Sequence, residues 1–391
     1  MPRIIHQRVS SFLPGSPLRR AGLSAGVALL MWLGACGGGG GGSASAPPSA
    51  PPPAPAFQIT NLVSDQATVA AATTDANLVN PWGLAYGPAT DFWVANQATA
   101  TTTAYDGLGH MPASPLVVSS PSLPGHTMGG PTGVVYNGSA GFMGDQFILA
   151  SLDGCLCGWS AGTTTTRRVG SSASSAVYTG LAIGTSGTAT YLYAANFTGG
   201  TIDVFDSAYA PASLGASALV DPTLPADFSP FNVQALGGKL YVTYAKRAPA
   251  ALRETTGAGL GYVSLFNLDG SFVRRVASAG ALNAPWGLAL APASFGPFSG
   301  ALLVGNFGDG RITAFDAATG AQLGQLSNAS SVPLSIGGLW GLAFGNDAGA
   351  GKSAQLYVTA GPQGETHGLF ATISYGAPSG GTGGPGGGGG Y

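Results

Sequence analysis

The side chains that could carry chemistry in this sequence are few, and they recur at repeated positions. Asparagines end three short apolar runs, at Asn96, Asn196 and Asn306, and Asp153 follows a fourth such run. Amide and carboxylate oxygens are the ligands that Ca²⁺ prefers, so these four residues are weak candidates for a calcium site. An Asn at this position is also suited to hydrogen bonding with the turn that follows a strand. Both interpretations stay open.

Aromatic and basic residues provide further candidates. Trp82, Trp286 and Trp340 share one position of a recurring phrase, where indoles could line a pocket for sugars or apolar ligands or pack between repeats. Two histidines could act as bases or as hydrogen-bonded structural residues. The complete set of predicted ligand-binding residues is Trp82, Asn96, His126, Asp153, Asn196, Arg247, Trp286, Asn306, Trp340 and His367.

The sequence has few residues suited to acid–base catalysis. Glu occurs only at Glu254 and Glu365, and both lie in predicted loops. A glycosidase needs two opposed carboxyl groups, and no such pair can be placed. No P-loop pattern occurs in the sequence, and the dinucleotide-binding spacing occurs only within its Gly-rich ends. The stretch Gly158-Trp-Ser-Ala-Gly162 has the spacing of a nucleophile elbow, but no helix is expected after it, so it does not predict a strand-to-helix turn with an exposed nucleophile. We therefore favour a binding or scaffold protein, with a calcium-assisted, lactonase-like hydrolase as the alternative and a purely structural surface protein as a third interpretation.

A repeat of about 50 residues must position these groups. Its clearest phrase is Pro-Trp-Gly-Leu-Ala, and the register residues Gly83, Gly133, Gly180, Val233, Gly287 and Gly341 are 50, 47, 53, 54 and 54 residues apart. A β-rich run such as 92–96 follows each phrase, and then an alternating strand such as 201–206. Several short strands per repeat of this length are typical of propeller blades. The sequence predicts an all-β, six-bladed β-propeller over residues 57–376.

The composition agrees with this fold class. Only 8% of residues are charged, and the chain has three lysines and two glutamates, too few for the wet faces of a helical protein. Blades one to five are each expected to have a fourth, outer strand. Blade six ends without one, so residues 57–65 are predicted to complete it and to close the ring.

The repeat also predicts where the candidates lie. In a four-stranded blade, the start of the first strand and the loop between strands two and three emerge on the same face. All the candidate residues fall there, with Lys246, Asp309 and Glu365 beside them. We expect Asp309 to be a turn residue and the long loop that Lys246 and Arg247 open to form a solvated face.

The N-terminal segment of the chain predicts its cellular location. Residues 1–36 combine four arginines, an apolar run and Leu33-Gly-Ala-Cys36, which resembles a lipobox, so we expect a signal peptide with acylation of Cys36. Export by the general or the twin-arginine route stays open. Residues 37–56 form a Gly-rich, then Pro/Ala-rich tether, and residues 377–391 a Gly-rich tail expected to be disordered.

These segments predict an exported, lipid-anchored protein of the bacterial cell envelope, with the outer membrane as the expected location. From Cys36 onward there are 10 basic and 16 acidic residues, which gives nucleic-acid binding no support. The expected partners are the membrane, through Cys36, and an envelope protein or a small-molecule or carbohydrate ligand. The expected state is a monomer, and Ca²⁺ is the single cofactor considered.

Two cysteines remain, Cys155 and Cys157. In a strand their Cβ atoms would lie too far apart for a disulfide, although a turn could close the gap. A disulfide and a pair of buried thiols both stay open. A metal site is not expected, because no second Cys pair or nearby His accompanies them.

The blade phrases also carry a resemblance. They are similar to NHL-type six-bladed propellers, and the stretches 282–292, 300–311 and 359–370 resemble an uncharacterised family of exported bacterial NHL-like propeller proteins. The resemblance covers most of residues 57–376. It implies the fold and export, and it brings no established catalytic or binding residues.

Overall fold

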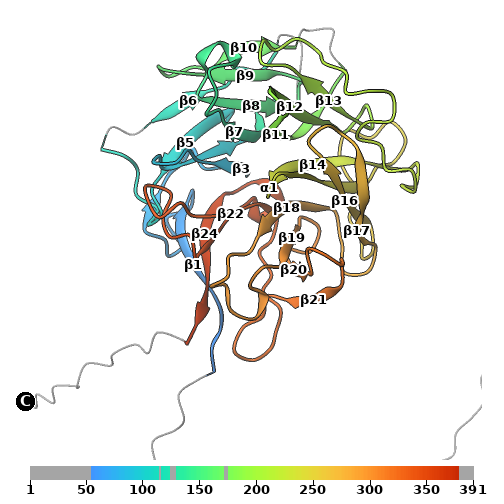
Figure 1. Cartoon of the computed structure of the whole chain (residues 1–391). Helices are drawn as coiled ribbons and strands as arrows, with labels where there is room; N and C mark the ends of the chain where they lie inside the picture. Colours follow the sequence, from blue (N-terminus) through green and yellow to red (C-terminus); the bar gives the residue numbers. More distant parts are fainter. Residues whose placement is uncertain (1–53, 114–115, 124–128, 171–174, 378–391) are drawn as a thin grey trace, which may run out of the picture. The chain divides into compact units, whose positions relative to one another are not determined.

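In the computed structural model, residues 54–113, 116–123, 129–170 and 175–377 are described. They form six β-sheets arranged as blades around one axis (Figure 1). The prediction of a six-bladed, all-β propeller is confirmed. The signal peptide with Cys36, most of the tether, His126 and nearly all of the Gly-rich tail lie outside the described residues.

Four blades are antiparallel meanders of four strands. Blade one contains β3 (Pro81–Ala85), β4 (Phe92–Asn96), β5 (Thr101–Tyr105) and β6 (Val117–Ser119). Blade two contains β7 (Pro131–Tyr136), β8 (Phe147–Ser151), β9 (Leu156–Trp159) and β10 (Thr166–Val169). Blade four contains β14 (Phe228–Leu236), β15 (Lys239–Lys246), β16 (Gly261–Asn267) and β17 (Phe272–Ser278). Blade five contains β18 (Pro285–Leu290), β19 (Leu302–Asn306), β20 (Ile312–Phe315) and β21 (Gln322–Gln325).

Blade six joins the two ends of the propeller, as predicted. Its strands are β22 (Leu339–Phe344), β23 (Leu356–Ala360), β24 (Leu369–Gly376) and β1 (Ala56–Ser64), and the short β2 (Thr73–Thr74) pairs with β1. β1 and β24 are antiparallel, with Ala56 opposite Gly376 and Ser64 opposite Leu369. The ring is therefore closed by backbone hydrogen bonds between segments about 300 residues apart.

The predicted fourth strand is wrong for blade three, whose sheet consists of β11 (Tyr178–Ser186), β12 (Ala189–Asn196) and β13 (Thr201–Phe205). The segment that follows β13 crosses to blade four instead. Leu219 N donates to Gly270 O at 2.7 Å, and Asp221 accepts hydrogen bonds from Ser264 and Arg275, both at 2.5 Å. Prolines at 211, 222 and 225 interrupt this segment, and proline cannot donate to a strand ladder.

Each inner strand has a β-bulge near its first residues, which sets the repeat register. The residue after each bulged position is usually glycine, because neighbouring blades leave no room for a Cβ atom there. A Cβ on Gly287 would lie 2.4 Å from Trp340 O, and one on Gly341 would lie 2.7 Å from Trp82 O. In blade four this position is Asn232 and not Val233, because the bulge falls between Pro230 and Asn232.

The hydrophobic cores lie between adjacent blades, where the sheet faces pack against one another. The helical segments are single turns, at Phe142–Gly144, Gly296–Phe298 and Pro362–Glu365 (α1). Among the described residues, no helix has the length and apolar character needed to cross a membrane.

Candidate binding site at the channel mouth

Aromatic side chains fill the propeller channel at the face where the inner strands begin, which we name the mouth face. The inner-strand bulges place Trp82, Phe231, Trp286 and Trp340 in contact across the axis, from blades one, four, five and six. The rings of Trp82 and Trp340 are stacked with centroids 3.6 Å apart, and Trp286 meets both edge-on at about 6 Å. This axial aromatic layer is buried. β-Bulges commonly redirect side chains in this way.

The polar atoms of the layer are only partly satisfied. Trp286 Nε1 donates to Thr179 O at 2.8 Å, and Trp340 Nε1 donates to Asn80 Oδ1 at 2.9 Å. Trp82 Nε1 is buried and has no hydrogen-bond partner among the described residues. These bonds fix the orientation of two of the three indoles.

Arg253 lies directly against this layer. It belongs to the long loop between β15 and β16, and its Cζ is 5.3 Å from the centre of the Trp82 ring and 5.9 Å from the centres of the Trp340 and Phe307 rings. A guanidinium at these distances interacts favourably with the ring faces. The Arg253 side chain is 32% exposed, so the cation is half-buried at the mouth.

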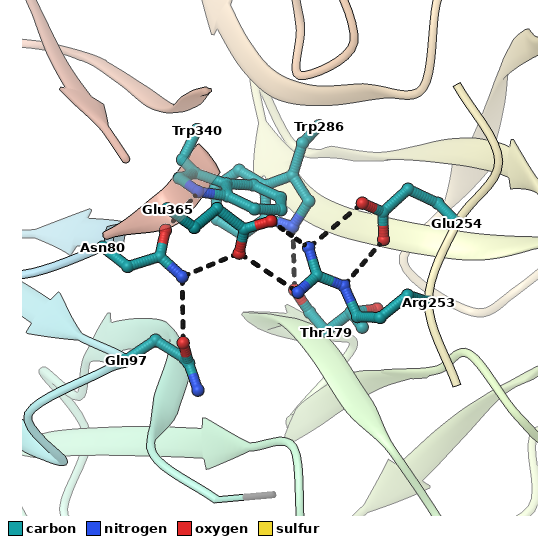
Figure 2. A network of polar contacts seen from close by, with 8 residues as sticks. All are labelled: Asn80, Gln97, Thr179, Arg253, Glu254, Trp286, Trp340 and Glu365. Carbon is teal, nitrogen blue, oxygen red and sulfur yellow. Dashed lines mark hydrogen bonds and ion pairs between the residues drawn. The ribbon is translucent and has the colours of Figure 1, made fainter. Parts of the chain in front are cut away.

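Both glutamates of the chain pair with this single arginine (Figure 2). Glu254 accepts hydrogen bonds from Arg253 Nε at 3.0 Å and Nη2 at 3.1 Å. Glu365 accepts from Nη1 at 3.1 Å and Nη2 at 2.7 Å. Burial alone lowers the pKa of Arg253, but the two carboxylates outweigh it and raise that pKa above its ordinary value. The arginine is therefore charged at neutral pH.

Glu365 is held from behind by amides of blade one. Asn80 Nδ2 donates to Glu365 Oε2 at 2.8 Å and to Gln97 Oε1 at 2.9 Å, and Gln97 Nε2 donates to Gly129 O at 2.8 Å. Asn80 and Glu365 both have positive φ angles, 47° and 69°. Asparagine tolerates this backbone conformation, which is less favourable for glutamate, and other described residues such as Tyr209 and Ala284 share it.

The channel continues on the other side of the aromatic layer. There the later halves of the six inner strands surround a cavity of about 420 Å³. Its walls are mainly small and aliphatic, with Trp286 as the member shared with the layer and Tyr86 and Phe344 toward the opposite face. The layer thus separates a polar mouth from an apolar channel.

The structure brings together three of the predicted site residues, the tryptophans Trp82, Trp286 and Trp340. The three asparagines bond within their own blades. Asn96 Nδ2 donates to Thr103 Oγ1 at 2.9 Å, Asn196 Oδ1 accepts from Gly199 N at 3.0 Å, and Asn306 Oδ1 accepts from Asn283 N at 3.1 Å. Only Asn196 bonds the turn that follows its strand, as that interpretation predicts; Asn96 bonds a side chain of β5, and Asn306 bonds the segment before β18. Calcium binding stays a prediction.

The remaining described candidates form hydrogen bonds or ion pairs outside the Arg253 cluster. Asp153 accepts from Leu123 N at 2.6 Å, Arg247 Nε donates to Ser229 Oγ at 3.0 Å, and His367 Nδ1 lies 2.7 Å from Asp65 Oδ2. Lys246 pairs with Asp227 at 3.1 Å, and Asp309 accepts from Arg311 N at 3.2 Å within its turn. No cluster of three His, Cys, Asp or Glu side chains suited to a metal occurs among the described residues.

Cys155 and Cys157 form a disulfide, one of the two interpretations left open by the sequence. A turn closed by Ser151 N donating to Cys155 O at 3.1 Å brings Cys155 to the start of β9. Both cysteines are buried beside Leu123.

Sequence reasoning missed Arg253, Asn80 and Gln97. One signal was present: Glu254, one of only two glutamates, directly follows Arg253 in the loop between β15 and β16. Its partner Glu365 lies 112 residues from Arg253, and a single sequence gives no measure of that proximity.

Solved structures support the fold alone. The chain superposes on a soluble aldose sugar dehydrogenase of Escherichia coli with a TM-score of 0.52 at 14% identity, over 81% of this chain and 99% of that one. A glucose dehydrogenase gives a TM-score of 0.50 at 12% identity, over 81% of this chain and 99% of that one.

Closer relatives are known from sequence. No established family profile matches the chain. Two uncharacterised proteins of Acanthamoeba polyphaga mimivirus are 36% identical over 305 residues and 34% identical over 307 residues, each match covering 73% of this chain and 73% or 78% of the viral protein. These relatives are viral, whereas the sequence resemblance implied bacterial ones. The chain belongs to the same protein family as these two mimivirus proteins.

Proposed function

We propose that this propeller is a binding module that presents its mouth face to a ligand. One observation carries the proposal: a half-buried guanidinium is held against three aromatic rings by both glutamates of the chain. Aromatic rings and arginine are the residue types that dominate binding energy in protein interfaces.

The cluster of Arg253, Glu254 and Glu365 favours a binding role over a catalytic one. All four carboxylate oxygens of Glu254 and Glu365 accept hydrogen bonds from Arg253. A general acid or base needs a carboxyl oxygen that can reach a proton of the substrate, whereas these four oxygens are already engaged by the guanidinium. The arrangement suits recognition of charge and shape.

We further propose that the module is an exported, NHL-like propeller anchored to a bacterial cell envelope through acylated Cys36. The motif Leu33-Gly-Ala-Cys36 and the Gly- and Pro-rich segment after it support this part of the proposal. The ligand would then be an envelope protein or a small molecule, including a carbohydrate.

Site-specific photo-crosslinking tests the binding role. A photo-reactive amino acid replaces Leu252, which is 47% exposed beside Arg253, or Leu323, which is 50% exposed on the outer strand β21 of blade five. The two positions match in exposure and differ in place. We expect adducts in the native cells from position 252 and a much lower yield from position 323. Equal yields, or adducts at 323 alone, would contradict a mouth-face site.

Metabolic labelling tests the anchor. Full-length protein should incorporate an alkyne-tagged fatty acid and fractionate with membranes, and the Cys36→Ser variant should do neither. Label retained in Cys36→Ser would exclude Cys36 as the acylated residue, without affecting the proposal for the mouth.

A further inference from the structure

The mouth of the channel has the composition of a cage for an organic cation. The rings of Trp82 and Phe307 both stack on that of Trp340, with centroids 3.6 and 4.2 Å apart, and the Arg253 guanidinium lies against this stack, 5.3 to 5.9 Å from the three ring centres. Glu365 offers both carboxylate oxygens in the two-point geometry that a guanidinium matches. Every cage wall is therefore of a type that selects a planar cation.

These walls are built independently of the arginine that fills them. Trp340 and Asn80 hydrogen-bond each other at 2.9 Å, and Asn80 in turn orients Glu365 at 2.8 Å. The wall residues come from blades one, five and six, and Arg253 comes from the loop of blade four. A cage whose carboxylate and Trp340 indole are fixed by hydrogen bonds to Asn80 is preorganised for a ligand.

The loop that supplies Arg253 is fastened mainly at its ends. Arg247 N donates to Asp227 O and Thr255 N to Lys246 O, both at 2.8 Å, and Gly257 N donates to Asn283 Oδ1 at 2.7 Å. Between these bonds, residues 248–250 and Leu252 are exposed. Arg253 joins this loop tip to Glu365, and the adjacent Glu254 side chain is only 4% exposed, so both side chains move if the tip moves.

The charges permit an exchange of cations. Arg253, Glu254 and Glu365 together carry one net negative charge. If the loop tip moves out, Arg253 retains its pair with the adjacent Glu254 and leaves as a neutral unit. Glu365 then remains in the cage as one carboxylate for one incoming cation, so neither the loop nor the cage is left with an unpaired charge.

We propose that this cage is a guanidinium-binding site and that Arg253 is its internal occupant, which a ligand's guanidinium group replaces. The inference rests on the proposed binding role of the mouth face and specifies its ligand chemistry. The ligand is either a small free guanidinium compound or an arginine side chain of a protein.

Titration of the empty cage tests the proposal. Full-length Arg253→Ala protein is titrated with methylguanidinium chloride by calorimetry, with sodium chloride at equal ionic strength as the salt control. We expect Arg253→Ala to bind methylguanidinium about tenfold more tightly than wild type, whose cage is filled, and about tenfold more tightly than Arg253→Ala/Glu365→Gln. The control variant is Arg274→Ala. It removes an arginine of β17 in blade four that donates to Ala317 O, and its affinity for methylguanidinium should equal that of wild type.

Equal affinity of Arg253→Ala, wild type and the double variant would overturn the proposal. If Arg253→Ala does not fold alone, recovery of its melting transition in methylguanidinium but not in sodium chloride would support the cage, and continued unfolding in both would contradict it. Titration with agmatine and with the peptide amides Gly-Arg-Gly and Gly-Gln-Gly separates the two sources. Binding by purified protein can succeed even if photo-crosslinking places the cellular ligand elsewhere, so the two proposals fail separately.

Discussion

Arg253 and Glu365, 112 residues apart in the chain, form a two-point ion pair with contacts of 2.7 and 3.1 Å across the channel mouth. The pair joins the loop of blade four to the short helix α1 of blade six, over rings supplied by blades one, five and six. It closes the polar end of the channel, whereas the other end remains a cavity of about 420 Å³.

The pair should show strong energetic coupling. We expect Arg253→Ala and Glu365→Gln each to lower the free energy of unfolding, and the double variant to lose less than the sum of both, with a coupling of about 1–3 kcal/mol. Denaturant unfolding of the four proteins measures this cycle. Strict additivity would show that the two side chains do not interact in solution.

The register glycines should tolerate no side chain. In Gly287→Ala, the new Cβ would lie 2.4 Å from Trp340 O and 2.6 Å from Leu342 Cγ. We therefore expect the free energy of unfolding to fall by about 1–3 kcal/mol. Gly337→Ala is the matched control, since a Cβ there has no heavy atom within 4 Å. Thermal melts compare the two, and similar melting temperatures would refute the packing account of the repeat register.

Ring closure should depend on β1. A chain that begins at residue 66 lacks β1 and leaves the edge of β24 unpaired, so we expect it to lose its cooperative melting transition. A chain that begins at residue 54 keeps every described strand and should melt as the full protein does. Circular dichroism follows both truncations. A normal transition in the shorter chain would show that the other five blades suffice.

Acid should weaken the contact between blades three and four. Burial alone would raise the pKa of Asp221, but hydrogen bonds from Arg275, Ser264 and Thr223 outweigh it and lower the pKa to about 2. A carboxylate with a lowered folded-state pKa stabilises the protein above its unfolded pKa, and that contribution is lost as the pH falls toward 2.

Asp221→Asn should therefore lower stability at pH 7, by on the order of 2 kcal/mol, and flatten the decline between about pH 4 and pH 2. Unfolding measured at several pH values checks this. An unchanged acid limb in the variant would assign the decline to other carboxylates.

Local patterns predicted most of the fold because each blade repeats the same constraints. Glycine is required where the inner strands of neighbouring blades crowd together, as at Gly287 and Gly341. Trp286 and Trp340 share one repeat position because equivalent bulges direct both side chains toward the channel axis. The closing strand was predictable because the segment before blade one had no other partner. The register residue of blade four was predicted to be Val233 and is Asn232. The error is one residue because a bulge shifts the register of a strand without changing its composition.

The remaining features depend on contacts between distant segments. The outer segment of blade three carries apolar residues, but they pack on blade four, where Leu219 N meets Gly270 O. Arg253 was not predicted as the cation at the mouth because its position depends on Glu365 of another blade, 112 residues away in the chain. The tryptophans were predicted at the mouth, but not that an arginine covers them.

A crystal structure of Arg253→Ala grown with methylguanidinium chloride tests the central claim most directly. The account predicts a bound guanidinium in the place of the Arg253 side chain, paired with both oxygens of Glu365 and lying against Trp82 and Trp340. A Glu365 carboxylate turned away from the axis, with no cation bound beside the rings, would contradict it.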